Sequence, residues 1–146
     1  MLIINYISLY LLSISVAVVF CTVQIRALNK SKYTKSILFL GMAISIYILG
    51  YVMELNSSTP ANIIFWNQVE YFGIPFVAAL WFTAGLQYTG LFDSYKKILF
   101  PVVYSIPLIT FILRFTNDFH HLYFISTDYI EKFGALIFTK QAGPWL

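Results

Sequence analysis

The stretch LIINYISLYLLSISVAVVFCTV, residues 2–23, contains no charged residue. A helix needs about 20 apolar residues to cross the roughly 30 Å hydrocarbon layer of a bilayer, so this stretch is long enough to span a membrane. It has neither the basic segment before it nor the small-residue cleavage site after it that are typical of a secretory signal peptide. We therefore expect this stretch to be retained as a transmembrane helix.

Three further apolar stretches follow the first one. We expect transmembrane helices at about residues 3–25, 36–54, 62–88 and 98–114. The apolar runs are continuous rather than alternating, which favours helices over the strands of a barrel. Over the whole chain 60% of the residues are hydrophobic and 10% are charged, whereas soluble domains have roughly 25% charged residues. The sequence predicts an all-α membrane protein, a bundle of about four transmembrane helices in region 1–114.

Prolines fall inside the third and fourth predicted helices, at Pro75, Pro101 and Pro107. Each proline removes one helical hydrogen bond, so we expect kinks at these positions. We assign Pro75 and Pro107 a structural role in helix packing. Gln87, near the end of the third helix, is expected to hydrogen-bond to another helix, as amide side chains do within membrane bundles.

The charged residues of the connections indicate an orientation. The connection Arg26–Lys35 holds four basic residues and no acid, Glu54–Asn62 holds one acid and no base, and Asp93–Lys97 holds two lysines against one acid. Basic loops tend to remain in the cytoplasm, which places the N-terminus and the second connection outside. Because the basic residues flank apolar runs and do not form one patch, we expect the lipid bilayer, and no nucleic acid, as partner.

Region 115–146 is more polar and is expected to lie outside the membrane. Its short apolar pieces Leu122–Ile125 and Ala135–Thr139, with Gly134 as a turn signal before the second, predict a loop or hairpin on the outer surface. The ending Gly143-Pro144-Trp145 is typical of the approach to another membrane helix. We expect the chain to be a fragment of a larger domain, and a truncated gene product or a deliberately shortened chain are alternatives.

Glu70 is the strongest candidate for a functional residue. It lies about 12 Å along the third predicted helix, at a depth where a carboxylate usually faces a bundle interior or a wet cavity. Asn67 shares its helix face, and Trp66 and Tyr71 flank that face. Glu54 ends the preceding helix at the same side of the membrane. We predict a ligand pocket here, formed by Glu54, Trp66, Asn67, Glu70 and Tyr71.

Simpler interpretations of these carboxylates stay open. Glu70 can lie at the outer interface in water or make a structural hydrogen bond, and Glu54 can be a solvated boundary residue. If Glu54 and Glu70 come close together, the pair would suit a cation or a shared proton.

We expect no metal ion, no cofactor and no enzymatic activity. His120 and His121 are adjacent, so their side chains point in different directions, and neither belongs to a spacing typical of metal ligands. The chain has no phosphate-binding glycine loop, no nucleophile elbow and no kinase signature.

An ordered set of short motifs resembles a known family. The motifs are Gly50-Tyr51 through Glu54, Trp66-x-x-Val69-Glu70-Tyr71-x-Gly73, Trp81, Gln87-Tyr88-Thr89-Gly90, Ile106-Pro107, Thr116-Asn117 with His120-His121-Leu122, and Gly143-Pro144-Trp145. Their order across nearly the whole chain is similar to that of the N-terminal seven-helix membrane region that precedes histidine kinase, and sometimes diguanylate cyclase, output domains in bacteria and archaea. The chain would contain its first four helices and the following outer loop.

The resemblance implies a sensory input module in the cell membrane of a prokaryote. Such a module would bind a small ligand of undefined identity and pass a conformational signal to an output domain, through which it can form a homodimer. The resemblance also implies that Trp66, Glu70 and Tyr71 belong to the shared core of the module. The alternatives are a small cation or proton transport or channel subunit, and a structural membrane protein that assembles with partners.

Overall fold

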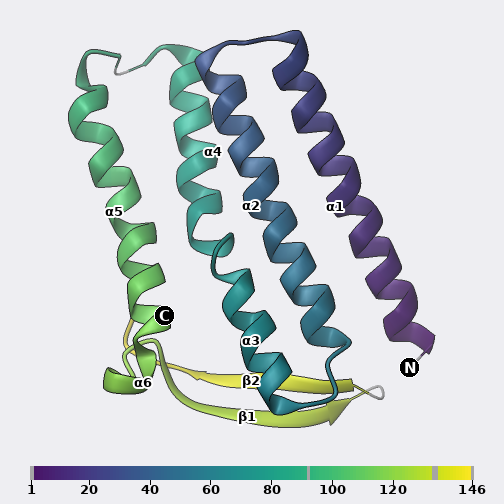
Figure 1. Ribbon diagram of the computed structural model, residues 1–146. Coiled ribbons are helices and arrows are strands. Elements are labelled where there is room, and N and C mark those ends of the chain that lie inside the picture. The colour runs from purple at the N-terminus through teal and green to yellow at the C-terminus, as the bar shows by residue number, and fades with distance from the viewer. Residues whose placement is uncertain (1, 92, 133–134, 146) are drawn as a thin grey trace.

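The structure of the protein is a computed structural model that describes residues 2–91, 93–132 and 135–145. Helices make up most of the chain, and a hairpin follows them (Figure 1). The elements are α1 (Leu2–Leu28), α2 (Lys32–Leu55), α3 (Pro60–Glu70), α4 (Ile74–Thr89), the 3-10 helix η1 (Asp93–Tyr95), α5 (Lys96–Phe115), α6 (Asn117–His120), β1 (Phe124–Lys132) and β2 (Ala135–Ala142). The expected turn residue Gly134 lies outside the described residues.

Four segments are long and apolar enough to cross a membrane, which confirms the predicted bundle. They are Ile3–Leu28, Lys32–Leu55, Pro60–Thr89 and Lys97–Phe115. Large apolar side chains point outward along them: Val16 is 69% exposed, and Trp81 and Ile98 are each 70% exposed. Apolar surface of this extent is not stable in water and is solvated by lipid. The chain is a multi-pass membrane protein.

Local sequence explains where the helices begin. α2 starts at Lys32 rather than at about residue 36, because a lysine stem can lie along apolar surface while its ammonium group reaches the interface. α3 starts after Thr59, whose hydroxyl accepts a hydrogen bond from the backbone N–H of Asn62 (3.4 Å). Pro60 follows in the first turn, where a missing N–H costs nothing.

The third membrane span is interrupted rather than only kinked. α3 ends at Glu70, a turn follows, and α4 begins at Ile74. Pro75 therefore lies in the first turn of a new helix, where it is well tolerated. Gly73 allows this turn to pack on α2, because a Cβ atom at Gly73 would collide with the backbone oxygen of Ala43.

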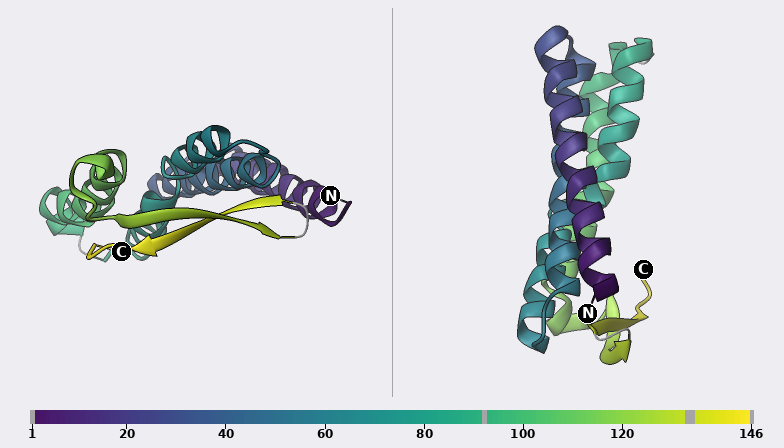
Figure 2. Two further views of the ribbon diagram at one scale, coloured as in Figure 1. Left: turned by 90° about the horizontal axis from the view of Figure 1, so that it is seen from below. Right: turned by 90° about the vertical axis from the view of Figure 1, so that its right-hand side faces the viewer.

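The membrane helices lie side by side in one layer, in the order α1, α2, α3 with α4, and α5 (Figure 1). The connections α1–α2 and α4–α5 lie together at one end of this layer, which we call the basic end. The N-terminus, the α2–α3 connection and the hairpin lie at the opposite end, which we call the hairpin end. Seen along the helices, the hairpin crosses beneath their ends (Figure 2).

The side chain of Asn117 connects the helices to the hairpin. Its Oδ1 accepts hydrogen bonds from the backbone N–H groups of Tyr123 (2.9 Å) and Phe124 (3.0 Å), and its Nδ2 donates to the backbone oxygen of Phe124 (3.0 Å). β1 then pairs with β2 in antiparallel register, with Tyr129 opposite Phe138. The predicted hairpin is therefore present, and it is held at its first residue.

Candidate functional site

Five polar side chains from four elements meet at the hairpin end, and we call them the polar cluster. They are Glu54 of α2, Asn67 and Glu70 of α3, Arg114 of α5 and Lys140 of β2. Helices α2, α3 and α5 each have one end at the hairpin end, and they therefore bring Glu54, Asn67, Glu70 and Arg114 together there. The hairpin adds Lys140 by crossing beneath them.

Asn67 links the cluster through its amide group. Its Nδ2 donates hydrogen bonds to Glu54 Oε2 (3.0 Å) and to Glu70 Oε2 (3.4 Å). Its Oδ1 accepts a hydrogen bond from Arg114 Nη2 (2.9 Å). Asn67 is 1% exposed, so these bonds are shielded from competing solvent. One neutral amide therefore joins two carboxylates and one guanidinium group in the interior.

Glu70 has one carboxylate oxygen without a partner. Glu70 is only 4% exposed. Its Oε1 is buried and has no hydrogen-bond partner among the described residues. Gly50 of α2 leaves space for the Glu70 side chain, because a Cβ at Gly50 would lie 2.7 Å from Glu70 Cγ. A buried acceptor left unpaired is costly, so a bound water, ion or ligand that supplies a donor would stabilise it.

Glu70 is also one of the residues that line a cavity of about 400 Å³. The cavity lies between α2, α3 and the start of α4 on one side and β2 on the other. Glu54, Asn67, Glu70, Tyr71 and Lys140 line it, together with apolar and aromatic side chains of α2, α4 and β2. Cavities of roughly 300–1,000 Å³ with a few convergent polar groups are typical of small-molecule sites.

The ammonium group of Lys140 is surrounded by aromatic rings. Its Nζ lies 4.9 Å from the ring centre of Phe138, 5.1 Å from that of Phe124 and 5.8 Å from that of Tyr71. Burial lowers the pKa of Lys140 below its usual value of 10.5, while the negative charges of Glu54 and Glu70 act in the opposite direction. The cluster therefore holds an ammonium group between aromatic faces, a geometry that favours cations.

The structure brings together four of the five residues predicted to form a pocket: Glu54, Asn67, Glu70 and Tyr71. Trp66 is not among the described residues that line the cavity, and its ring instead packs edge-on against Phe65 at 5.1 Å.

The three residues predicted to be structural are not among the described residues that line this cavity. Gln87 accepts a hydrogen bond from the Ser36 hydroxyl of α2 (2.9 Å). Pro75 lies in the first turn of α4, and Pro107 is inside α5, which continues through both Pro101 and Pro107.

Sequence reasoning missed Arg114 and Lys140 as members of the cluster. Arg114 is the last residue of the fourth predicted helix, 98–114, and was not singled out as a candidate there. Its position gave a signal, however, because a lone arginine at the end predicted to be outside conflicts with the positive-inside rule. Lys140 carried no such signal, because its place depends on how the hairpin folds back.

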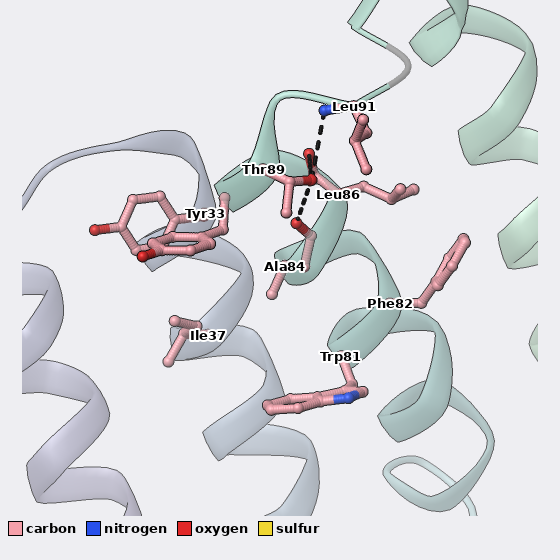
Figure 3. A pocket seen from close by; sticks show the side chains of 10 residues that line it. Tyr33, Ile37, Trp81, Phe82, Ala84, Leu86, Thr89 and Leu91 are labelled. Carbon is pink, nitrogen blue, oxygen red and sulfur yellow. Dashed lines mark hydrogen bonds between the residues drawn. The ribbon is translucent and has the colours of Figure 1, made fainter.

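A larger cavity, of about 540 Å³, lies between α2 and α4 near the basic end (Figure 3). Tyr33 and Ile37 line it from α2, and Trp81 and Phe82 from α4. The hydroxyl of Thr89 hydrogen-bonds to backbone groups of its own helix end and so offers little to a ligand. This apolar groove is suited to lipid chains rather than to a specific polar ligand.

The histidines of the tail take part in local bonds. His120 Nε2 lies 3.0 Å from the Thr116 hydroxyl, and its Nδ1 accepts a hydrogen bond from the N–H of Leu122 (3.0 Å). Within the described residues, no three His, Cys, Asp or Glu side chains form a group that could hold a metal ion. The turn at His121, with φ of 51°, leads into the hairpin.

Comparison with known proteins identifies the family. Searches of the curated proteins and of the solved structures find no match to this chain. The model of one family, described as the N-terminal 7TM region of histidine kinase, matches residues 9–146. This match spans nearly the whole chain, including all of the polar cluster and the hairpin. The chain belongs to the family of N-terminal 7TM regions of histidine kinases.

Proposed function

We propose that this chain belongs to the sensory input module of a membrane receptor of the histidine kinase type. We further propose that its ligand binds in the cavity at the hairpin end. The observation that carries this proposal is the cavity of about 400 Å³ in which Glu54, Asn67, Glu70 and Lys140 converge among aromatic side chains. The family membership supports a sensory and non-catalytic role.

The polar cluster suits the transmission of a signal because it joins elements that lie far apart in the sequence. Glu54, Asn67, Arg114 and Lys140 belong to α2, α3, α5 and β2, respectively. A ligand that binds one arrangement of these elements better than another shifts the population toward that arrangement. The break between α3 and α4 follows directly after Glu70, so a movement at the cluster can change the angle between the two helices.

The cavity indicates the chemistry of the ligand. The side chains of Glu54 and Glu70 line the cavity and accept hydrogen bonds, so the ligand should carry an N–H or O–H donor or a positive charge. Tyr47 and Tyr51 of α2 also line the cavity, and Tyr71 and Phe138 add further aromatic surface. A small amine or amide with an apolar part matches both features.

We also propose the orientation and the setting of the module. The N-terminus and the hairpin would face the outside of a prokaryotic cell membrane, and the basic end would face the cytoplasm. The arrangement supports this, because the basic connections Arg26–Lys35 and Asp93–Lys97 lie at the same end of the helices (Figure 1). Homodimerisation would occur through the output domain.

The proposal is tested in two steps. The coding sequence after the codon of Leu146 should continue into further apolar helices and a kinase or cyclase domain. In that receptor, Glu70→Gln should change the ligand-free output by about 5- to 150-fold, the range typical of coupling energies of roughly 1–3 kcal/mol. Phosphorylation in membrane vesicles measures the output, and immunoblotting of membranes measures insertion, which should not change.

Asp128→Asn is the matched control, because it makes the same chemical change at an exposed position of β1. It should leave the output within about twofold of that of the wild type. Equal outputs for the wild type and Glu70→Gln would show that the cavity does not take part in signalling. A stop codon followed by an unrelated gene would contradict the receptor proposal itself.

The second candidate function is cation or proton transport. It is favoured by one observation, the two buried carboxylates Glu54 and Glu70 on the same amide within the membrane region. Flux of protons into liposomes that contain the chain, abolished by Glu70→Gln, would support transport over sensing.

A further inference from the structure

Another cavity, of about 320 Å³, lies at the basic end between α2, α4 and α5. It is separate from the polar cluster, which occupies the hairpin end. It is also distinct from the apolar groove of Figure 3, because residues 32, 35, 36 and 39 of α2 line it, whereas residues 33 and 37 line the groove. The two cavities therefore open on different faces of α2.

The polarity of this cavity changes with depth. Lys32 begins α2 and Lys35 lies about 4.5 Å further along it, so both lysines stand at the mouth. Ser36 and Gln87 lie about 3–6 Å from the helix ends, and the Ser36 hydroxyl donates to Gln87 Oε1 (2.9 Å). Below them, at about 10 Å, the lining becomes apolar and aromatic, with Phe39 as one example.

One of the residues that line the cavity has an unsatisfied hydroxyl group. Thr83 of α4 lines the cavity and is 3% exposed, and its Oγ1 has no hydrogen-bond partner among the described residues. A threonine in a helix usually bonds to a backbone oxygen of the preceding turn. A free hydroxyl at this depth is costly in the membrane unless a ligand supplies its partner.

The exposed lysines are available to an anion. Arg26, on the neighbouring helix, is already engaged, because its Nη1 donates to the backbone oxygen of Ser31 (2.9 Å) and to the Thr34 hydroxyl (3.2 Å). Lys32 and Lys35 are both exposed, and the Nζ of Lys35 lies 5.8 Å from the ring centre of Phe39. Two positive charges at the mouth of an amphipathic cavity are complementary to a negatively charged headgroup with an apolar tail.

We propose that this cavity binds one anionic phospholipid. Lys32 and Lys35 hold the phosphate, the hydroxyl of Thr83 and the amide of Gln87 bond to the glycerol and ester oxygens, and an acyl chain covers the aromatic residues of α5. Basic pockets between transmembrane helices are known to take lipid headgroups, and each lysine near an anionic headgroup adds to the attraction. The lipid would join α2, α4 and α5 at the end that faces away from the hairpin.

The test is native mass spectrometry of the whole chain in detergent, with dioleoyl phosphatidylglycerol as the probe. The double variant Lys32→Gln with Lys35→Gln should bind the first lipid about 30-fold more weakly, which corresponds to about 1 kcal/mol per lysine at 1.4 kcal/mol per factor of ten. Thr83→Val keeps the shape of the side chain and should weaken binding about fivefold.

The matched control is Lys30→Gln with Lys97→Gln, which removes the same charge at the same end from two exposed residues outside the cavity lining. This pair should keep wild-type affinity. Equal losses for both double variants would mean general charge attraction and would overturn the proposal. Equal binding of dioleoyl phosphatidylcholine, or full competition by glycerol 3-phosphate, would also overturn it, because either result removes the need for an anionic lipid.

Discussion

Asn67 is the residue on which the polar cluster depends, because its amide bonds to Glu54, Glu70 and Arg114. Hydrogen bonds between neutral side chains in membrane bundles average about 0.6 kcal/mol, but bonds to buried charged groups contribute about 1.5–3 kcal/mol. We expect Asn67→Leu, which has a similar volume, to lower the free energy of unfolding by about 2–3 kcal/mol. Unfolding in mixed micelles, followed by circular dichroism, measures the change.

Gln68→Leu is the control, since Gln68 is the next residue of α3 and lies outside the cluster. It should change the free energy of unfolding by less than about 0.5 kcal/mol. If the two variants unfold at the same denaturant concentration, the network of Asn67 does not stabilise the fold.

The residue scale also shows what sequence can reveal of the site. The three-residue spacing of Asn67 and Glu70 predicted a shared helix face, because helical geometry fixes that relation. The bond from Arg114 to Asn67 joins residues 47 positions apart. No local rule gives such a contact, since it depends on which helices pack together. The same holds for Lys140, which reaches the cluster only after the hairpin has folded back.

At the scale of elements, the break between α3 and α4 depends on the close packing of Gly73 against α2. Gly73 has an ordinary backbone conformation, with φ of −105°, so only the contact with Ala43 requires a glycine. We expect Gly73→Ala to destabilise the protein by about 1–3 kcal/mol, because the added methyl group forces α2 and the turn apart. Thermal unfolding in one detergent measures this change.

For Gly85→Ala, in the same helix, we expect the opposite effect on stability. An added Cβ at Gly85 meets nothing within 4 Å, and Gly85 lies in the interior of α4. Alanine there should stabilise the helix by up to about 1 kcal/mol through its higher helix propensity. Destabilisation by both variants to the same degree would show that steric contact at Gly73 is not the cause.

The elements differ in how well the sequence predicted them. Apolar runs predicted four spans because the thickness of the bilayer sets their length. Pro75 predicted a disturbance of the third span, but not that Glu70 would end one helix and Ile74 begin another. That break depends on the fit of Gly73 against α2, which is a property of the packed structure. The hairpin was predicted from its apolar pieces, but its course beneath the helices was not.

At the scale of the whole molecule, the orientation in the membrane can be measured directly. Single cysteines at Ser58, in the α2–α3 connection, and at Lys30, in the α1–α2 connection, lie at opposite ends of the layer. In a Cys21→Ser background, a membrane-impermeant maleimide should label Ser58→Cys in intact cells and Lys30→Cys only after lysis. The opposite labelling pattern would place the N-terminus and the hairpin in the cytoplasm.

The single-layer arrangement has a consequence for the order of assembly. Each membrane helix packs on a helix that is close to it in the sequence: α1 on α2, α2 on α3 and α4, and α4 on α5. Contacts of this kind close short loops and form quickly. The layer can therefore grow helix by helix as the ribosome delivers the chain. The polar cluster is the exception, since Glu54 and Asn67 emerge long before Lys140 and must wait for the last strand to be synthesised.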